Sequence, residues 1–201
     1  MNKRFFWVCS YPKSGNTWMR AILTSLFFTN DGNFDFKLLP LIPTFEKAKI
    51  FDFVKNINKE DYYHLDNLNI LSKYWIESQK RMKINGDFSF FKSHSSLANI
   101  NNNLFTNTNN TLGLIYLIRN PLDVVVSYSK HLGKNTDEII KIITSNNSVT
   151  FTNDNHIKKL PFLLSRWDNH INSWLKIDSP KLILKYEDLV ENTINSINKI
   201  V

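Results

Sequence analysis

The chain has 201 residues, 42% hydrophobic and 21% charged, which is enough for one globular domain with a sizeable core. Its 15 Phe, 7 Tyr and 5 Trp exclude a disordered chain, and only 5 Gly and 6 Pro exclude a collagen-like or linker sequence. The formal net charge of +7 indicates an anionic partner, which charge alone leaves open as nucleic acid, anionic lipid or a phosphate-bearing small molecule.

A single cysteine, Cys9, excludes an intramolecular disulfide and fits a reducing compartment. No apolar run approaches the ~20 residues that a membrane span needs. The short apolar start runs directly into a Pro-Lys-Ser-Gly loop, which argues against a signal peptide. We therefore expect a cytoplasmic protein without a membrane span.

Short apolar runs bounded by turn residues predict four buried strands, at residues 5–9, 88–92, 112–118 and 181–185. Apolar residues at helical spacing predict helices that begin near residues 16, 121, 163 and 193, with partial helicity in 61–83. Two polar stretches, 99–110 and 145–155, predict loops.

The alternation of strands and helices predicts an α/β fold: a single domain with a central, mainly parallel sheet flanked by helices. The last predicted helix shows no stop signal before Val201. We therefore expect residues 1–201 to form one domain that is incomplete at its C-terminus.

The segment after the first strand, Tyr11-Pro-Lys-Ser-Gly15, leads into a helix for which Asn16 or Thr17 is the expected N-cap. A glycine loop at a helix N-terminus binds anions, because free backbone N–H groups and the helix dipole face the ligand. Lys13 adds a movable positive charge, and Ser14, Asn16 and Thr17 add side-chain donors. The Walker pattern is absent. The alternative is an ordinary strand–helix turn with a solvated lysine.

A second strand–helix junction carries Arg119. Asn120 suits an N-cap, Pro121 the first helical position and Asp123 the first turn. The planar guanidinium of Arg119 suits a phosphate, and Ser127, two turns into the helix, adds a hydroxyl donor. The alternative for Arg119 is an ion pair at the strand end.

The strand that ends near residue 92 places Lys92 and His94 on the same side, because strand side chains alternate. The carboxyl end of a strand is where α/β folds place chemistry. A lone histidine is more often a surface or core residue than a catalyst, and Glu77 or Asp87 is the competing candidate for a general base.

Two longer strings resemble motifs of the sulfotransferases that use 3′-phosphoadenylyl sulfate (PAPS). Tyr11-Pro-Lys-Ser-Gly-Asn-Thr-Trp18 resembles the loop that binds the 5′-phosphosulfate, with Asn16 where the family usually has Thr. Tyr116-Leu-Ile-Arg-Asn-Pro-Leu-Asp-Val-Val-Val-Ser-Tyr128 resembles the 3′-phosphate motif, with Arg and Ser eight positions apart. The resemblance implies a P-loop NTPase-like architecture and PAPS-binding residues Lys13, Ser14, Gly15, Asn16, Thr17, Trp18, Arg119, Ser127 and Tyr186.

The same resemblance includes Lys92-Ser-His94, similar to the family's Lys-Thr-His, and Tyr186-Glu-Asp-Leu189 after the last strand. It implies sulfuryl transfer from PAPS to a hydroxyl or amine of a small-molecule, carbohydrate or lipid acceptor, without a metal. In this interpretation His94 is the general base and Lys13 and Lys92 are catalytic. Trp18 and Tyr186 either stack on the adenine or fill the core.

Three other interpretations stay open. A nucleotide-dependent kinase needs a Walker loop and a magnesium carboxylate. A nucleic-acid-binding module needs basic residues on one face, whereas here they are scattered. A catalytically degenerate sulfotransferase fold remains because the family's later Gly-x-x-Gly-x-x-Lys segment does not occur in residues 1–201. The predicted helix with Trp167, His170 and Trp174 is interpreted as structural.

Overall fold

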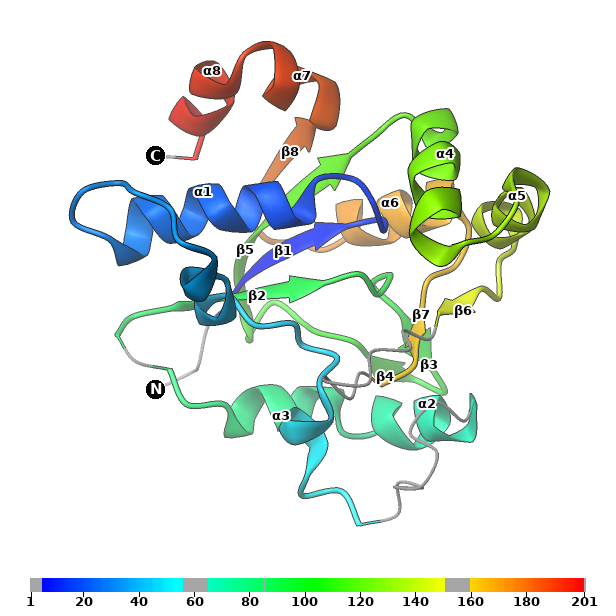
Figure 1. Cartoon of the computed structure of the whole chain (residues 1–201). Helices are drawn as coiled ribbons and strands as arrows, with labels where there is room; N and C mark the ends of the chain where they lie inside the picture. Colours follow the sequence, from blue (N-terminus) through cyan, green and yellow to red (C-terminus); the bar gives the residue numbers. More distant parts are fainter. Residues whose placement is uncertain (1–4, 56–64, 85, 151–159, 201) are drawn as a thin grey trace.

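The centre of the protein is a parallel sheet of four strands. The computed structural model describes residues 5–55, 65–84, 86–150 and 160–200. The strands lie in the order β2-β1-β5-β8, and every neighbouring pair is parallel. They are β1 (Phe5–Ser10), β2 (Ser89–Ser93), β5 (Thr111–Ile118) and β8 (Lys181–Lys185) (Figure 1). The predicted α/β class and parallel sheet are therefore confirmed, and the carboxyl ends of all four strands meet at one edge.

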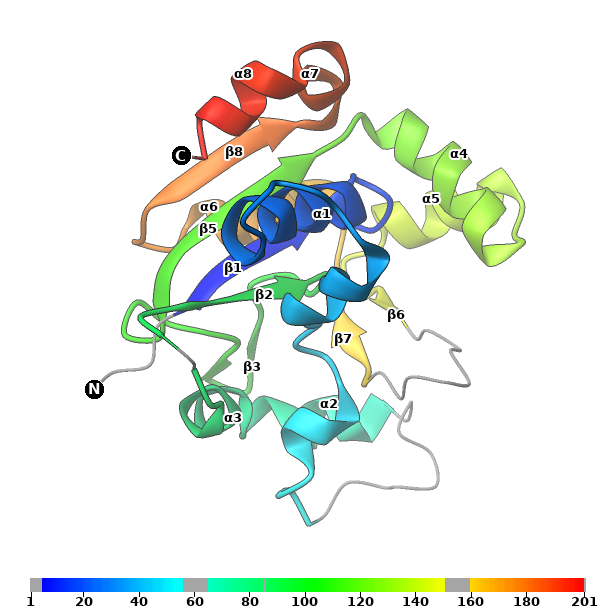
Figure 2. The same cartoon turned by 60° about the vertical axis from the view of Figure 1, so that its left-hand side comes forward.

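Helices cover both faces of this sheet. In Figures 1 and 2, α1 (Asn16–Phe28) crosses one face and α6 (Trp167–Leu175) crosses the other. The side chains of β1 alternate accordingly: Val8 packs in the cluster that contains α1, and Trp7 packs in the cluster that contains α6. Both faces are apolar, as a parallel sheet with two covered faces requires.

The other helices lie around the sheet. The C-terminal pair is α7 (Tyr186–Glu191) and α8 (Thr193–Asn198), on the same side as α1 (Figure 2). Beyond the carboxyl edge are α4 (Pro121–Leu132) and α5 (Thr136–Thr144). On the β2 side are α2 (Leu65–Ser72) and α3 (Trp75–Arg81).

Short elements complete the described fold. Two 3-10 turns are η1 (Phe36–Leu41) and η2 (Ala48–Phe51). Two antiparallel pairs are β3 (Asn99–Ile100) with β4 (Asn103–Leu104), and β6 (Val149–Thr150) with β7 (Phe162–Leu163). The expected loop at 145–155 overlaps the second pair and residues outside the described ranges.

The expected loop at 99–110 is wrong in part. It contains the β3–β4 hairpin and continues into a buried polar cluster around Gln79. Gln79 donates to the carbonyl of Phe105 at 2.6 Å, and its own oxygen accepts from Thr106 at 2.8 Å and from Asn110 at 3.2 Å. Polar composition did not reveal this burial, because buried polar groups are tolerated when they bond one another.

The predicted start of α4 is confirmed in detail. The side chain of Asn120 accepts from the N–H of Leu122 at 2.9 Å, and Pro121 is the first helical residue. Gly133 ends the helix with φ of 65°, the left-handed conformation that glycine adopts without strain. The cap therefore fixes the first turn of α4 immediately after Arg119.

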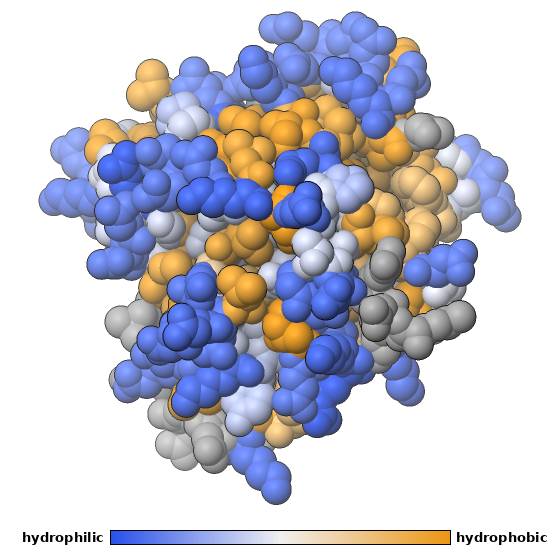
Figure 3. Space-filling view, turned by 180° about the vertical axis from the view of Figure 1, so that it is seen from behind, coloured by the Kyte–Doolittle hydropathy of each residue, from blue (hydrophilic) through white to orange (hydrophobic). Residues whose placement is uncertain are grey.

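The rear surface is partly apolar. Strand β8 is an edge of the sheet, and Ile183 on it remains 36% exposed. Figure 3 shows apolar residues gathered in the upper part of this rear face. Within the described ranges, no helix has the length and apolar character needed to cross a membrane.

Candidate functional site

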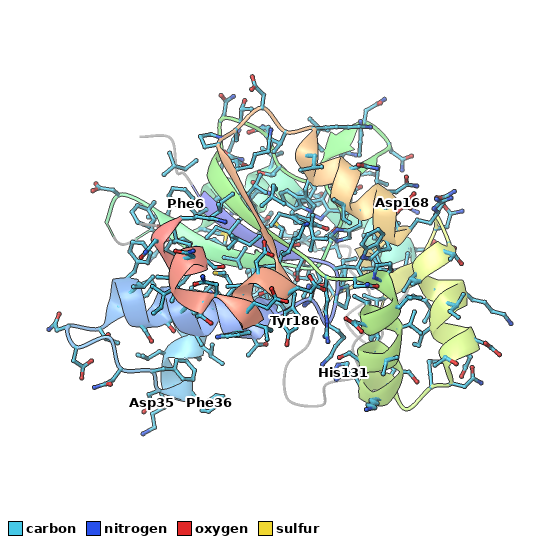
Figure 4. All side chains as sticks on the ribbon, turned by 90° about the horizontal axis from the view of Figure 1, so that it is seen from above. Phe6, Asp35, Phe36, His131, Asp168 and Tyr186 are labelled. Carbon is cyan, nitrogen blue, oxygen red and sulfur yellow. The ribbon has the colours of Figure 1, made fainter. Side chains whose placement is uncertain are left out.

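A cavity of about 630 Å³ opens at the carboxyl edge of the sheet. The chain leaves β1 toward β2 on one side and then crosses to β5 on the other, so the end of β1 is a topological switch point, where α/β sheets bind ligands. Ten of the predicted site residues line this cavity: Lys13, Gly15, Asn16, Thr17, Trp18, Lys92, His94, Arg119, Ser127 and Tyr186. In Figure 4 the labelled Phe36, His131 and Tyr186 surround it from three sides.

The loop after β1 forms the first anion-binding junction. Lys13 has φ of 67° and Gly15 has φ of 93°, so both adopt the left-handed conformation. Gly15 is itself the N-cap of α1 and makes no side-chain cap bond, so the expected N-cap at Asn16 or Thr17 is wrong. No acidic residue occupies the first turn of α1. The positive end of this helix is therefore available to an anion.

Asn16 does not use its side-chain donor toward the cavity. Its amide donates to the carbonyl of Val8 at 3.0 Å and to the hydroxyl of Ser10 at 3.2 Å. The side chain therefore braces the end of β1 where the family usually has Thr. The expectation that the Asn16 side chain donates to a ligand is therefore wrong in this structure. Asn16 still lines the cavity.

Three buried polar atoms near the loop lack a partner among the described residues: the donors Ser14 Oγ and Arg119 Nε, and the acceptor Asn16 Oδ1. Arg119 lines the cavity, whereas Ser14 is fully buried and is the one predicted site residue that does not line it. A buried donor without a hydrogen-bond partner destabilises the protein by about 1–3 kcal/mol. An anion that accepts a hydrogen bond from this donor removes that destabilisation. The residues present therefore fit a phosphate-bearing group at this junction.

Arg119 joins the second junction to the first. Its Nη1 donates to the carbonyl of Lys13 at 2.9 Å, and its guanidinium lies 4.3 Å from the ring centroid of Tyr186. A Cβ added to Gly15 would lie 2.7 Å from Cδ2 of the Tyr186 ring. Glycine is thus required at position 15 for both its backbone conformation and this close approach. Ser127 lines the same cavity from α4.

The two aromatic residues proposed to face the adenine differ in their surroundings. Trp18 and Tyr186 meet edge to face, with ring centroids 6.1 Å apart. One side of the Tyr186 ring is already occupied by Arg119. Tyr186 therefore supports the guanidinium, and Trp18 is the better placed of the two for contact with a base.

The orientation of His94 follows from one hydrogen bond. Its Nδ1 lies 2.8 Å from the carbonyl oxygen of Ser10 and 3.3 Å from the hydroxyl of the same residue. A carbonyl only accepts, so Nδ1 carries the proton and Nε2 is the acceptor nitrogen of the neutral ring. Lys92 lines the same cavity, as the strand alternation predicted. His94 thus has the tautomer that a general base needs.

Neither of the competing carboxylates, Glu77 and Asp87, is among the described residues that line the cavity. Glu77 accepts from Arg81 at 2.6 Å on the exposed surface of α3, and Asp87 lies outside the lining residues. A different carboxylate, Glu46, is buried beneath β2, where it accepts from the hydroxyl of Ser93. Burial raises the pKa of Glu46. No sequence motif marked this residue.

His170 on α6 lies directly behind His94, which the sequence did not reveal. Its Nε2 lies 3.0 Å from the carbonyl oxygen of His94, and its Nδ1 lies 2.6 Å from the hydroxyl of Tyr116. Burial lowers the pKa of His170 to about 4. The available signal was a histidine on the apolar face of a helix between Trp167 and Trp174.

The wall of the cavity opposite the loop after β1 is largely apolar, and sequence patterns did not identify it. This wall is formed by η1 and the segment that precedes it, by α4, and by β6 and β7. Its residues are Phe34, Phe36, Tyr128, Leu132, Thr150 and Phe162. Phe36 is 75% exposed at the rim. None of the described lining residues is acidic. This half of the cavity suits an apolar organic molecule.

A family model described as the sulfotransferase domain matches residues 3–201. The chain belongs to the sulfotransferase family. Among curated relatives, an amine sulfotransferase of Oryctolagus cuniculus is 27% identical over 96% of this chain and 53% of its own length. A 3-alpha-hydroxysteroid sulfotransferase of Cavia porcellus is 25% identical over 95% of this chain and 55% of that protein. A flavonol 3-sulfotransferase of Flaveria bidentis is 24% identical, over 96% and 54%.

The fold is also found in a solved structure of retinol dehydratase in complex with retinol and PAP. It has a TM-score of 0.55 and 17% sequence identity, with 100% of this chain and 59% of that chain covered. The two chains therefore share the α/β fold. The chain spans about half the length of the curated relatives that it matches.

Metal ligands do not gather in the parts of the chain that the structure describes. In those ranges no group of three or more His, Cys, Asp or Glu side chains could hold a metal ion. Cys9 is a free, fully buried thiol, and burial raises its pKa.

Replacing Gly15→Ala tests the contact with Tyr186. Gly133→Ala is the matched control, because Gly133 also has positive φ but has no atom near its added Cβ. The control should lose about 1–2 kcal/mol of unfolding free energy from backbone strain alone. Gly15→Ala should lose more, since its methyl displaces Tyr186 from Arg119. Equal losses in urea unfolding would contradict the proposed packing.

The buried neutral state of His170 predicts an acid-sensitive fold. Its folded pKa lies below its unfolded value, so stability is complete above about pH 6.5 and falls as the unfolded chain gains the proton. Between pH 7 and 5 the loss should be about 2 kcal/mol. Tyr11 and Tyr116, which face the ring, stay protonated because burial raises each pKa.

The measurement is urea unfolding of the wild type and of His170→Gln at several pH values. Glu46 titrates in both proteins and cancels in the comparison. The variant should show a shallower fall of unfolding free energy toward pH 5, and parallel curves would show that His170 does not bind a proton on unfolding.

Proposed function

We propose that this chain binds PAPS and catalyses sulfuryl transfer to a small-molecule acceptor. The single observation that carries the proposal is the shared cavity. The N-terminal turn of α1 with Lys13, the side chain of Arg119 at the β5–α4 junction, and His94 with its acceptor nitrogen line one space of about 630 Å³. An anion-binding junction alone would suit many phosphate ligands, whereas a general base beside two such junctions favours group transfer.

Each cavity residue has a separate role in the proposed sulfuryl transfer. When bound, PAPS supplies a sulfuryl group joined through an oxygen to its 5′-phosphate. His94 accepts the proton of the acceptor through Nε2, so that the acceptor oxygen or nitrogen can bond to sulfur as the bridging S–O bond breaks. Lys13 stabilises the charge that develops on the bridging oxygen, and Lys92 holds the sulfonate. Arg119 and Ser127 bind the 3′-phosphate.

The acceptor is proposed to be a small organic molecule that carries a hydroxyl or an amine. The apolar wall around Phe36 and Phe162 supports this, and relatives are named for amines, a hydroxysteroid and a flavonol. A screen of phenols, steroids, flavonols and amines with labelled PAPS tests it. We also infer a cytoplasmic location, which fits a chain with one cysteine, Cys9, and which cell fractionation tests.

Calorimetric titration with adenosine 3′,5′-bisphosphate tests the nucleotide site directly. Arg119→Met should weaken binding roughly 10- to 100-fold, because it removes charged hydrogen bonds worth about 1.5–3 kcal/mol. Arg81→Met is the matched control: this arginine also lies over an aromatic ring, that of Phe53, at 4.2 Å, but lies outside the cavity. It should bind like the wild type. Absence of binding by the wild-type chain would refute the proposal.

His94→Ala should lower turnover roughly 10²- to 10⁴-fold while binding of adenosine 3′,5′-bisphosphate stays nearly intact. Glu77→Gln removes the competing carboxylate and should leave turnover unchanged. The rates are measured with labelled PAPS and the best acceptor from the screen. Turnover of His94→Ala within about twofold of the wild type would remove His94 from this role.

A further inference from the structure

A buried histidine, His170, lies beneath the ends of three strands that carry the site. It contacts His94 after β2 and Tyr116 on β5 through hydrogen bonds of 3.0 and 2.6 Å. Its ring also meets that of Tyr11, the first residue after β1, with centroids 5.3 Å apart. His170 is fully buried, and it does not line the cavity. It therefore acts on the site only through the residues that it holds.

The partners of His170 leave it one protonation state. The carbonyl of His94 only accepts, so Nε2 of His170 carries the proton and donates it. Burial lowers the pKa of His170 to about 4, so the ring is neutral at pH 7, and Nδ1 accepts from the hydroxyl of Tyr116. Both ring nitrogens are satisfied in the neutral ring, and a second proton on Nδ1 would face the tyrosine hydroxyl in a buried space.

The segment that carries His94 is held from α6 at further points. Trp174 Nε1 donates to the carbonyl of Ser95 at 2.9 Å, and the N–H of Leu97 donates to the hydroxyl of Ser173 at 2.9 Å. With the bond from His170, α6 makes three hydrogen bonds to residues 94–97. Such anchoring fixes the backbone from which the His94 ring projects.

We propose that His170 is a positioning residue for His94. By holding the carbonyl of His94, it keeps the adjoining ring on the carbonyl of Ser10, so that Nδ1 remains the protonated nitrogen and Nε2 the acceptor. This role rests on the proposed function of His94 as the general base. A buried neutral imidazole thus sets the tautomer of a second imidazole through the backbone between them.

Histidine ¹⁵N NMR tests the proposal without substrate. The chain has five histidines, and spectra of His94→Ala and His170→Gln assign the two signals. In the wild type, His94 should be protonated on Nδ1 and His170 on Nε2. In His170→Phe, which keeps a ring but removes both hydrogen bonds, His94 should populate both tautomers. In His170→Gln, which keeps an N–H donor, the wild-type state of His94 should return.

Kinetics provide the second readout, with a control for lost stability. His170→Phe should lower kcat roughly 10- to 100-fold, as misplacing a catalytic group does, and leave the KM for PAPS within about twofold. Gln79→Met removes a buried polar cluster near β4, away from the cavity, and should leave kcat unchanged. His170→Gln should recover most of the loss.

Two results would overturn the proposal: an unchanged His94 tautomer in His170→Phe, or a loss of kcat no larger than that of Gln79→Met. These failures are distinct from failure of the proposed function. If the wild-type chain does not bind adenosine 3′,5′-bisphosphate while the His94 tautomer still depends on His170, then the positioning contact stands and only the sulfotransferase assignment falls.

Discussion

One guanidinium joins the ends of three strands into a single site. Arg119, after β5, donates to the carbonyl of Lys13, after β1, and lies over the ring of Tyr186, after β8. Gly15 permits the approach of that ring because it has no Cβ. A cation placed to meet an anion thus also holds the loop and the aromatic ring around it. The basic half of the cavity depends on this contact.

Beneath the cavity, buried polar side chains position the chemistry instead of contacting a ligand. Asn16 donates to Ser10, Ser10 accepts from His94, and His170 donates to the backbone of His94. These hydrogen bonds lie inside the protein, where breaking one leaves a buried polar group without a partner. Buried groups therefore determine the orientation of residues that face the cavity, such as His94.

Much of the fold could be predicted because it depends on local patterns. The four strands were found within one residue of their observed ends by their short apolar runs, and the start of α4 by Asn120 and Pro121. The two junctions with Lys13 and Arg119, and Lys92 with His94, were located the same way, because each lies within a short continuous segment. The loop prediction at 99–110 was wrong in part, because composition does not show whether polar side chains bond to water or to one another.

The sequence by itself determined the family, the parallel α/β order and the residues at the strand ends, because motifs and periodicity are local. Only the tertiary structure decided which partners those residues have. The tautomer of His94 depends on Ser10, which is 84 positions away, and the place of His170 depends on Tyr116 and His94, which are 54 and 76 positions away. The support of Arg119 comes from Tyr186, on a different segment. Such contacts arise from the packing of strands and helices, and no pattern within one segment encodes them.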